Sequence, residues 1–309
     1  MTTLVFTHPA CLEHDAGPGH PESPARLRAV LEALHQPQFE KLVWREARRA
    51  TDEEIERVHA RAYVAQVMHA VPQVGRVSLD LDTAVSPGSG EAALRAAGAV
   101  CGAVDAVAAG EGANAFCAVR PPGHHAERDR AMGFCLFNNI AIGALHARAK
   151  HGFRRAAVVD FDVHHGNGTQ DSFAADSDLF YASTHQWPAY PGTGAADERG
   201  AAGNIVNVPL APYSGSPEFR AAWSRIILPA LADFAPDFIL ISAGFDAHAD
   251  DPLASLELRD DDYAWVTGEI AKIAKEKCAG RVVSALEGGY DIRALANSCA
   301  AHVAALMTA

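Results

Sequence analysis

The 309-residue sequence lacks the features of several specialised protein classes. It has no block of five or more Lys and Arg residues and a formal net charge of −12, which argues against a nucleic-acid partner. The apolar run at 238–245 is far too short to span a bilayer. The opening MTTLVFTHPA has neither the charged region nor the long apolar region of a secretory signal. We therefore expect no nucleic acid and no membrane among its partners.

The six cysteines are also poorly placed for a disulfide framework or a four-cysteine zinc site. None belongs to a C-x-x-C pair, and they stand at positions 11, 101, 117, 135, 278 and 299. We interpret them as mostly buried thiols in a reducing cytosol, which predicts a cytoplasmic protein.

Short apolar segments alternate with helical patterns along the chain, with no linker or repeat between them. Several segments are continuously apolar, as parallel strands covered on both faces are. The predicted strands are 3–7, 115–119, 156–159, 179–183, 205–208, 238–242 and 282–286. The alternation predicts an α/β fold with a doubly wound parallel sheet, in one domain over residues 1–309.

Helix ends are predicted from capping residues. Ser23 and Pro24 open one helix, and Thr51 with Glu54 fits a capping box. Ser89 is expected to cap the Ala-rich helix that follows it, and Pro229 to kink or break the helix that opens at Ser216.

Five of the predicted strands lead directly into residues that can bind metal or transfer protons. Because ligands of open α/β sheets bind beyond the carboxyl ends of the strands, these residues should meet at one edge. The segments are RPPGHH at 120–125, DFDVH at 160–164, TH at 184–185, AGFD at 243–246 and EGGY at 287–290.

Asp162 and His164 are two residues apart, so in an extended chain they point to the same side. They can hold one ion, with Asp246 as the natural third ligand, and zinc bonds in such a site are about 2.0–2.2 Å long. Three ligands leave a position open, as a catalytic zinc site requires. The alternative is a solvated turn at a strand end.

The remaining polar and aromatic residues of these segments each allow two interpretations. One of His124 and His125 could move a proton, and the Tyr290 phenol could donate to a developing oxyanion. They could equally be surface histidines and a packed tyrosine. Phe134 and Phe245 could wall an apolar channel or be ordinary core aromatics.

Taken together, the motifs resemble the zinc-dependent histone deacetylase family. The resemblance rests on five motifs, in order across nearly the whole chain, and HPESPARL at 20–27 is similar to the class II branch. The motifs are RPPGHH (120–125), GFCLFNN (133–139), DFDVHHGNGTQ (160–170), AGFDAH (243–248) and EGGY (287–290).

The resemblance implies an arginase-like three-layer α/β fold with an eight-stranded, mostly parallel sheet. It implies one catalytic Zn²⁺ on Asp162, His164 and Asp246. It also implies catalytic roles for five residues: His125 as general base and then acid, His124 as its electrostatic partner, Tyr290 polarising the amide carbonyl, and Asp160 and Asn167 supporting the two histidines.

The resemblance further implies an acyl-lysine tunnel and a structural K⁺ or Na⁺ ion. Phe134 would line the tunnel and Gly133 would leave space in it. A residue near 185–191, with His185 as the candidate, would complete the wall together with Phe245. Leu253 stands where polyamine-specialised members carry an acidic residue. The monovalent ion would use Asp160 and Ser183.

Asn167 departs from the class I pattern, in which an aspartate supports the second histidine. An amide is neutral and cannot favour imidazolium as a carboxylate does. We therefore expect His125 to lose its proton more easily than His124.

Several functions fit the pattern to different degrees. An arginase-like enzyme with two manganese ions is disfavoured because Gly166 and His248 stand where carboxylates would be needed. A non-catalytic acyl-binding scaffold is disfavoured by Tyr290. Within the amidohydrolases, acylated lysine peptides are favoured over acetylpolyamines and other small acylated amines. The oligomeric state is open, and a homo-oligomer is compatible with the sequence.

Overall fold

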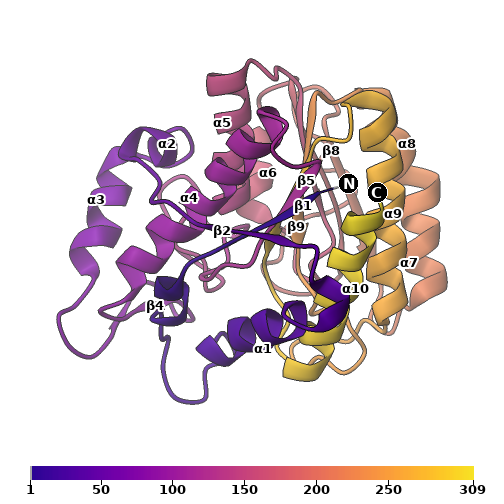
Figure 1. Ribbon diagram of the computed structural model, residues 1–309. Helices are drawn as coiled ribbons and strands as arrows, with labels where there is room; N and C mark the ends of the chain where they lie inside the picture. Colours follow the sequence, from indigo (N-terminus) through magenta and orange to yellow (C-terminus); the bar gives the residue numbers. More distant parts are fainter. Residues whose placement is uncertain (1) are drawn as a thin grey trace.

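The computed structural model describes residues 2–309 and shows one eight-stranded sheet between layers of helices (Figure 1). The strand order is β2-β1-β5-β10-β9-β6-β7-β8, and each neighbouring pair is parallel. The strands are β1 (Thr3–Thr7), β2 (Val43–Glu46), β5 (Asn114–Cys117), β6 (Ala156–Asp160), β7 (Leu179–Gln186), β8 (Ile205–Leu210), β9 (Phe238–Ala243) and β10 (Val282–Leu286). A separate antiparallel ribbon joins β3 (Val77–Ser78) to β4 (Ala84–Val85).

Helices cover both faces of the sheet. Helices α4 and α5 pack together on one face, and α9 and α10 pack together on the other, with α1 against α10 (Figure 1). The helices are α1 (Pro24–Leu34), α2 (Asp52–Glu56), α3 (Arg61–Ala70), α4 (Ser89–Ala108), α5 (Asn139–His151), α6 (Asn167–Phe173), α7 (Ser216–Ala222), α8 (Leu228–Phe234), α9 (Asp260–Lys277) and α10 (Ile292–Thr308). This three-layer arrangement is the predicted fold class, and the sheet is parallel throughout.

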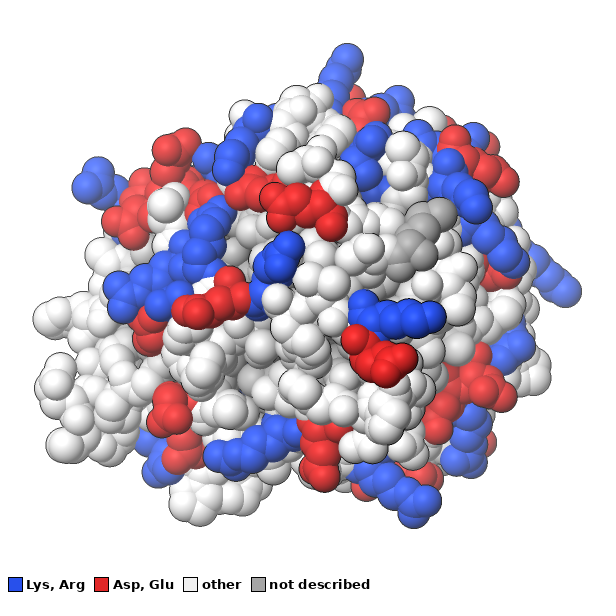
Figure 2. Space-filling model, in the orientation of Figure 1, with Lys and Arg blue, Asp and Glu red and all other residues white. Residues whose placement is uncertain are grey.

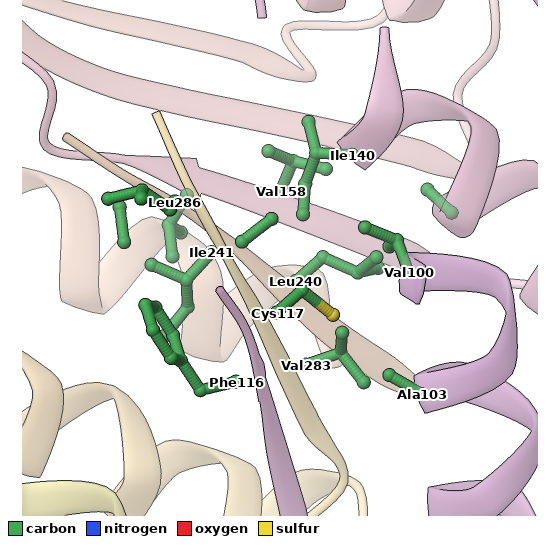
Figure 3. Packing of buried hydrophobic residues seen from close by; sticks show 14 of the residues in the cluster. Val100, Ala103, Phe116, Cys117, Ile140, Val158, Leu240, Ile241, Val283 and Leu286 are labelled. Atoms are coloured by element: carbon green, nitrogen blue, oxygen red, sulfur yellow. The ribbon is translucent and has the colours of Figure 1, made fainter. Parts of the chain in front are cut away.

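The centre of the sheet is apolar on both faces, which explains the continuously apolar strands. Leu240 of β9 lies beside Val100 of α4 and Val283 of β10 lies beside Ala103, whereas Phe116 and Ile241 lie together on the opposite side (Figure 3). These residues are fully buried. The strands therefore form a rigid platform whose carboxyl ends can hold polar side chains in place.

The sequence predicted seven of the eight strands of this sheet to within a few residues and missed β2. Its sequence VWRE lies at an edge and is half-buried or exposed, so it has no continuous apolar run. The capping box of Thr51 and Glu54 is confirmed, with both hydrogen bonds formed.

Ser89 is the first residue of α4 rather than its cap, because its hydroxyl bonds to Ser86 and His14 instead. Pro229 follows a π-helical turn at Trp223–Ile227, which separates α7 from α8. None of the helices in residues 2–309 is long and apolar enough to cross a bilayer.

Candidate active site

Two carboxylates and an imidazole converge just beyond the carboxyl ends of β6 and β9. His164 Nδ1 lies 3.2 Å from Asp162 Oδ1 and 3.1 Å from Asp246 Oδ2. Ligand atoms of the three residues lie within 4.8 Å of one another. Both aspartates are about 1% exposed, so their charges are removed from water and need a cation nearby.

Backbone groups from three loops hold this cluster in place. Asp246 Oδ1 accepts from the Val163 N–H at 2.9 Å, and Asp162 Oδ2 accepts from the Gly288 N–H at 2.8 Å. A Cβ atom on Gly288 would stand 2.6 Å from Asp162 Oδ2 and press on Asp246 as well. Glycine is therefore required at this position to leave room around the carboxylates.

The two adjacent histidines have different partners. His124 Nδ1 faces Asp160 Oδ2 at 3.0 Å, and Asp160 also accepts from the Tyr181 hydroxyl at 3.1 Å. Burial alone would lower the pKa of His124, but the carboxylates of Asp162 and Asp160 outweigh it and raise the pKa to about 10. Burial lowers the pKa of His125 well below its usual value, and the positive charges of His124 and His164 lower it further.

The neutral partner of His125 also fixes which nitrogen carries the proton. Asn167 Nδ2 donates to Glu127 Oε1 at 2.7 Å, and a carboxylate can only accept. Asn167 Oδ1 must then face His125 Nδ1, 2.8 Å away, and accept its N–H. The other ring nitrogen of His125, Nε2, is left with a free lone pair.

A cavity of about 210 Å³ opens onto this cluster. Tyr290 closes one side, with its ring 5.8 Å from that of Phe134 in an edge-on arrangement. Burial raises the pKa of Tyr290 well above its usual value, so the phenol keeps its proton. The lining residues are Asp82, His125, Gly133, Phe134, His164, Tyr190, Leu253 and Tyr290.

Comparisons with known proteins identify the family of this chain. A family model described as the Histone deacetylase domain matches residues 20–306. The chain belongs to the histone deacetylase family. It is therefore a hydrolase of the deacetylase and amidohydrolase type, and the resemblance seen in the motifs is confirmed.

Relatives from bacteria, archaea and plants extend over most of the chain. A histone deacetylase-like amidohydrolase of Pseudomonas aeruginosa is 41% identical, over 94% of this chain and 82% of its own length. A probable deacetylase of Archaeoglobus fulgidus is 39% identical, with the same two coverages. The crystal structure of an HDA15 HD domain superposes with a TM-score of 0.94 at 36% identity, covering 99% of this chain and 88% of the other.

Two residues that we expected in the deacetylase channel lie outside the pocket. His185 is fully buried, with Nδ1 3.0 Å from Ser183 Oγ and Nε2 2.9 Å from the Gly194 carbonyl. Phe245 is also fully buried and packs on Phe161 and Tyr263. Tyr190, from the loop after His185, lines the pocket in their place.

The residues expected at a monovalent cation site are neighbours in the sheet. Asp160 of β6 is paired in register with Ser183 of β7. Both polar groups already have protein partners, because Asp160 Oδ1 accepts from the Asp162 N–H at 3.0 Å and Ser183 bonds to His185. A K⁺ or Na⁺ ion here stays a prediction.

Glu287, in the EGGY segment, has a supporting role that the sequence motifs did not predict. Its Oε2 accepts from the Gly123 N–H at 2.6 Å and from the His124 N–H at 3.2 Å, which fixes the loop that carries both histidines. Burial raises the pKa of Glu287 to about 7. Its position directly after the apolar strand β10 could have indicated a buried carboxylate with a structural role.

A buried arginine supports the Tyr290 segment in a similar way. Arg26 donates from Nε to the Gly289 carbonyl at 2.6 Å and from Nη2 to the Glu287 carbonyl at 2.5 Å. Its guanidinium lies 4.8 Å from the centre of the Tyr290 ring. Glu22 pairs with both Arg26 and Arg120, so HPESPARL and RPPGHH form one buried ionic network.

Proposed function

We propose that this protein uses one zinc ion to remove acetyl or other short acyl groups from lysine side chains. The observation that carries the proposal is a narrow pocket that ends at the Asp162–His164–Asp246 cluster, between a proton acceptor and a phenol donor. Each of these parts has a place in amide hydrolysis.

The cluster suits zinc by its chemistry. Asp162, His164 and Asp246 provide one nitrogen and two carboxylate donors, a set that catalytic zinc sites use with one position open. Gly288 leaves space beside the carboxylates, and the carboxylates themselves are buried. Both features favour a small divalent cation. When bound, zinc would make a water molecule more acidic and polarise the amide carbonyl.

His125 is assigned the proton transfers. Its Nε2 lone pair can accept a proton from the attacking water and then return it to the departing amine. Asn167 supports this role because a neutral amide holds the ring without favouring imidazolium. His124, paired with Asp160, contributes positive charge beside the reacting carbonyl.

Tyr290 is assigned the stabilisation of the oxyanion. Its phenol keeps its proton, and Tyr290 lines the same pocket as His125, so it can donate to the oxygen on which negative charge develops. The Arg26 contacts hold its backbone and ring in position. Acetate and a free amine would leave without a covalent enzyme intermediate.

The pocket walls favour an acylated alkyl chain as substrate. Phe134, Tyr190 and Leu253 offer apolar surface along the opening, suited to the methylene groups of an acyl-lysine. An acetylpolyamine is the second candidate, because the Asp82 carboxylate also lines the pocket and could attract a cationic amine. Leu253 supplies no second acid, which favours the lysine peptide.

Two broader expectations and two disfavoured alternatives accompany this proposal. We assign residues 1–309 to a single catalytic domain, and the protein to the cytoplasm because all six cysteines are buried and free. The two-manganese alternative stays disfavoured, and the acyl-binding scaffold would require Tyr290 to be idle.

Acetate release tests the proposal directly. Zinc-loaded protein is given an acetyl-lysine peptide and an acetylated polyamine in parallel, with and without a hydroxamate inhibitor. We expect hydroxamate-sensitive release, faster from the peptide, and none from the Asp246→Ala variant. Faster release from the polyamine would favour the second candidate. No release from either substrate with zinc bound would favour the scaffold.

A further inference from the structure

A second group of metal-binding side chains lies between α4 and α5, away from the active site. His146 Nε2 lies 2.8 Å and His151 Nε2 lies 2.7 Å from the same atom, Asp105 Oδ1. Donor atoms of the three residues lie within 4.8 Å of one another. Two imidazoles and a carboxylate are the same types of ligand that transition metals take in proteins.

The positively charged side chains near Asp105 do not contact the oxygen atom, Oδ1, that faces the two histidines. Lys150 Nζ, at 2.9 Å, and Arg48, at 3.5 Å, both contact the other carboxylate oxygen, Oδ2. A metal ion on Oδ1 would therefore not have to displace them. Although burial raises the pKa of Asp105, its contacts with His146, His151 and Lys150 lower it below the usual value, so the carboxylate is ionised.

A second carboxylate stands behind His146. Glu54 Oε1 lies 3.2 Å from His146 Nδ1, and two Arg48 contacts of 2.7 and 2.6 Å hold Glu54 in its ionised form. A carboxylate on the far nitrogen of a histidine orients the ring and strengthens it as a metal ligand. Arg57 also approaches Nδ1 at 3.2 Å and competes for this contact.

The cluster is accessible and separate from the catalytic edge. The His151 and Asp105 side chains are 22% and 25% exposed, whereas that of His146 is 2% exposed. Helix α5 begins beside the catalytic loop, where Asn139 bonds to the Pro121 carbonyl, and it ends at His151. At 1.5 Å per residue the two ends are about 18 Å apart.

We propose that Asp105, His146 and His151 form a second transition-metal site, of the zinc class, that ties α4 to α5. Ligand atoms around a tetrahedral zinc ion lie about 3.3 Å apart, so each ring has to withdraw by about half an ångström. Water can fill the fourth position because the cluster is open to solvent. A metal ion needs a free lone pair on each imidazole, so acid should weaken its binding.

Metal content in matched variants tests this site. Asp246→Ala is used as the background because it removes the proposed catalytic ion, and Zn²⁺ bound at micromolar free concentration is measured by equilibrium dialysis. We expect wild-type protein to hold about two equivalents and Asp246→Ala about one. Adding His151→Ala should remove the remaining equivalent, whereas adding His69→Ala, at an exposed histidine of α3, should not. Circular dichroism confirms that each variant is folded.

A second measurement identifies the ligands. Co²⁺ bound to Asp246→Ala should give visible absorption bands that Asp105→Asn and His151→Ala abolish, and His151→Ala alone should keep wild-type acetate release. The proposal is overturned if Asp246→Ala binds no zinc above the level of the double variant, which would mean that the three side chains only hydrogen-bond to one another. Retention of the second equivalent in His151→Ala would also overturn it.

Discussion

Substituting alanine for Gly133 should disable the proposed general base and leave the proposed zinc ligands intact. Gly133 lies beside the His125 ring in the pocket and has a left-handed backbone, with φ +57°. An alanine Cβ at this position would lie 2.7 Å from His125 Cγ, whereas ordinary contacts are 3.4–4 Å. The ring would therefore have to move by about 1 Å.

The displacement of the His125 ring should reduce the catalytic rate strongly and the stability of the fold moderately. The His125–Asn167 hydrogen bond of 2.8 Å would be broken by a movement of that size. A misplacement of about 1 Å costs roughly 10²-fold in rate. The left-handed backbone adds about 1–2 kcal/mol of strain to the folded state of an alanine variant.

A matched glycine separates these two effects. Gly110 has φ +74° and no atom within 4 Å of its added Cβ, so Gly110→Ala carries the backbone strain without the contact. Both variants should lose stability in urea unfolding and keep their zinc, with the larger loss in Gly133→Ala because it also breaks a buried hydrogen bond. Only Gly133→Ala should lose kcat by about 10²-fold. Wild-type turnover by folded Gly133→Ala would refute the assignment of His125.

Three further predictions test other parts of the molecule. Tyr290→Phe keeps the ring packing but loses the hydroxyl, so kcat should fall about 10²–10³-fold with zinc retained. Leu253→Glu should shift preference toward the acetylpolyamine by adding a negative charge at the pocket mouth. Burial lowers the pKa of His59 from 6.5 to about 4, so the fold should lose stability as the pH falls from about 6.5 to 4, by up to roughly 3 kcal/mol. Urea unfolding at several pH values measures this loss.

Each of these predictions has an outcome that contradicts it. Unchanged turnover in Tyr290→Phe would leave the oxyanion without an assigned donor. An unchanged substrate preference would mean that position 253 does not select the substrate. His59 Nε2 accepts the Asn138 N–H at 2.8 Å, so the neutral ring is part of the fold. The stability of His59→Gln should therefore fall less at low pH than that of the wild type. An equal fall would mean that a group other than His59 causes the acid sensitivity.

The fold was predictable because its central strands are apolar on both faces. Segments such as 156–159 and 282–286 carry their own signal, and helix ends such as Thr51–Glu54 are determined by neighbours in sequence. The edge strand β2 was not predictable in this way, since half-exposed residues do not distinguish it from a loop. The order of the strands in the sheet was not predictable either, because it depends on contacts between residues that are far apart in the sequence.

The location of the site was predictable, but its supporting contacts were not. Residues at the ends of several strands had to meet at one edge, so the cluster of Asp162 and His164 with Asp246 could be expected. Whether a side chain faces the pocket depends on loop geometry. The segment 185–191 was expected to line the channel, but the residue that does so is Tyr190 rather than His185. The Glu127–Asn167 contact joins two loops 40 positions apart, and no local pattern indicates it.

The charges at this edge favour the proposed cation there. Four carboxyl groups, those of Asp160, Asp162, Asp246 and Glu287, are at most 1% exposed. Burial raises the pKa of Asp246, and the charge of Asp162 raises it further. The protonated His124 ring offsets only part of the negative charge of the cluster. Arg26 does not cancel it directly, because its guanidinium donates to backbone carbonyls and to Glu22. A divalent cation would balance two of these charges and leave a coordination position facing the pocket, which a lysine or arginine side chain could not do.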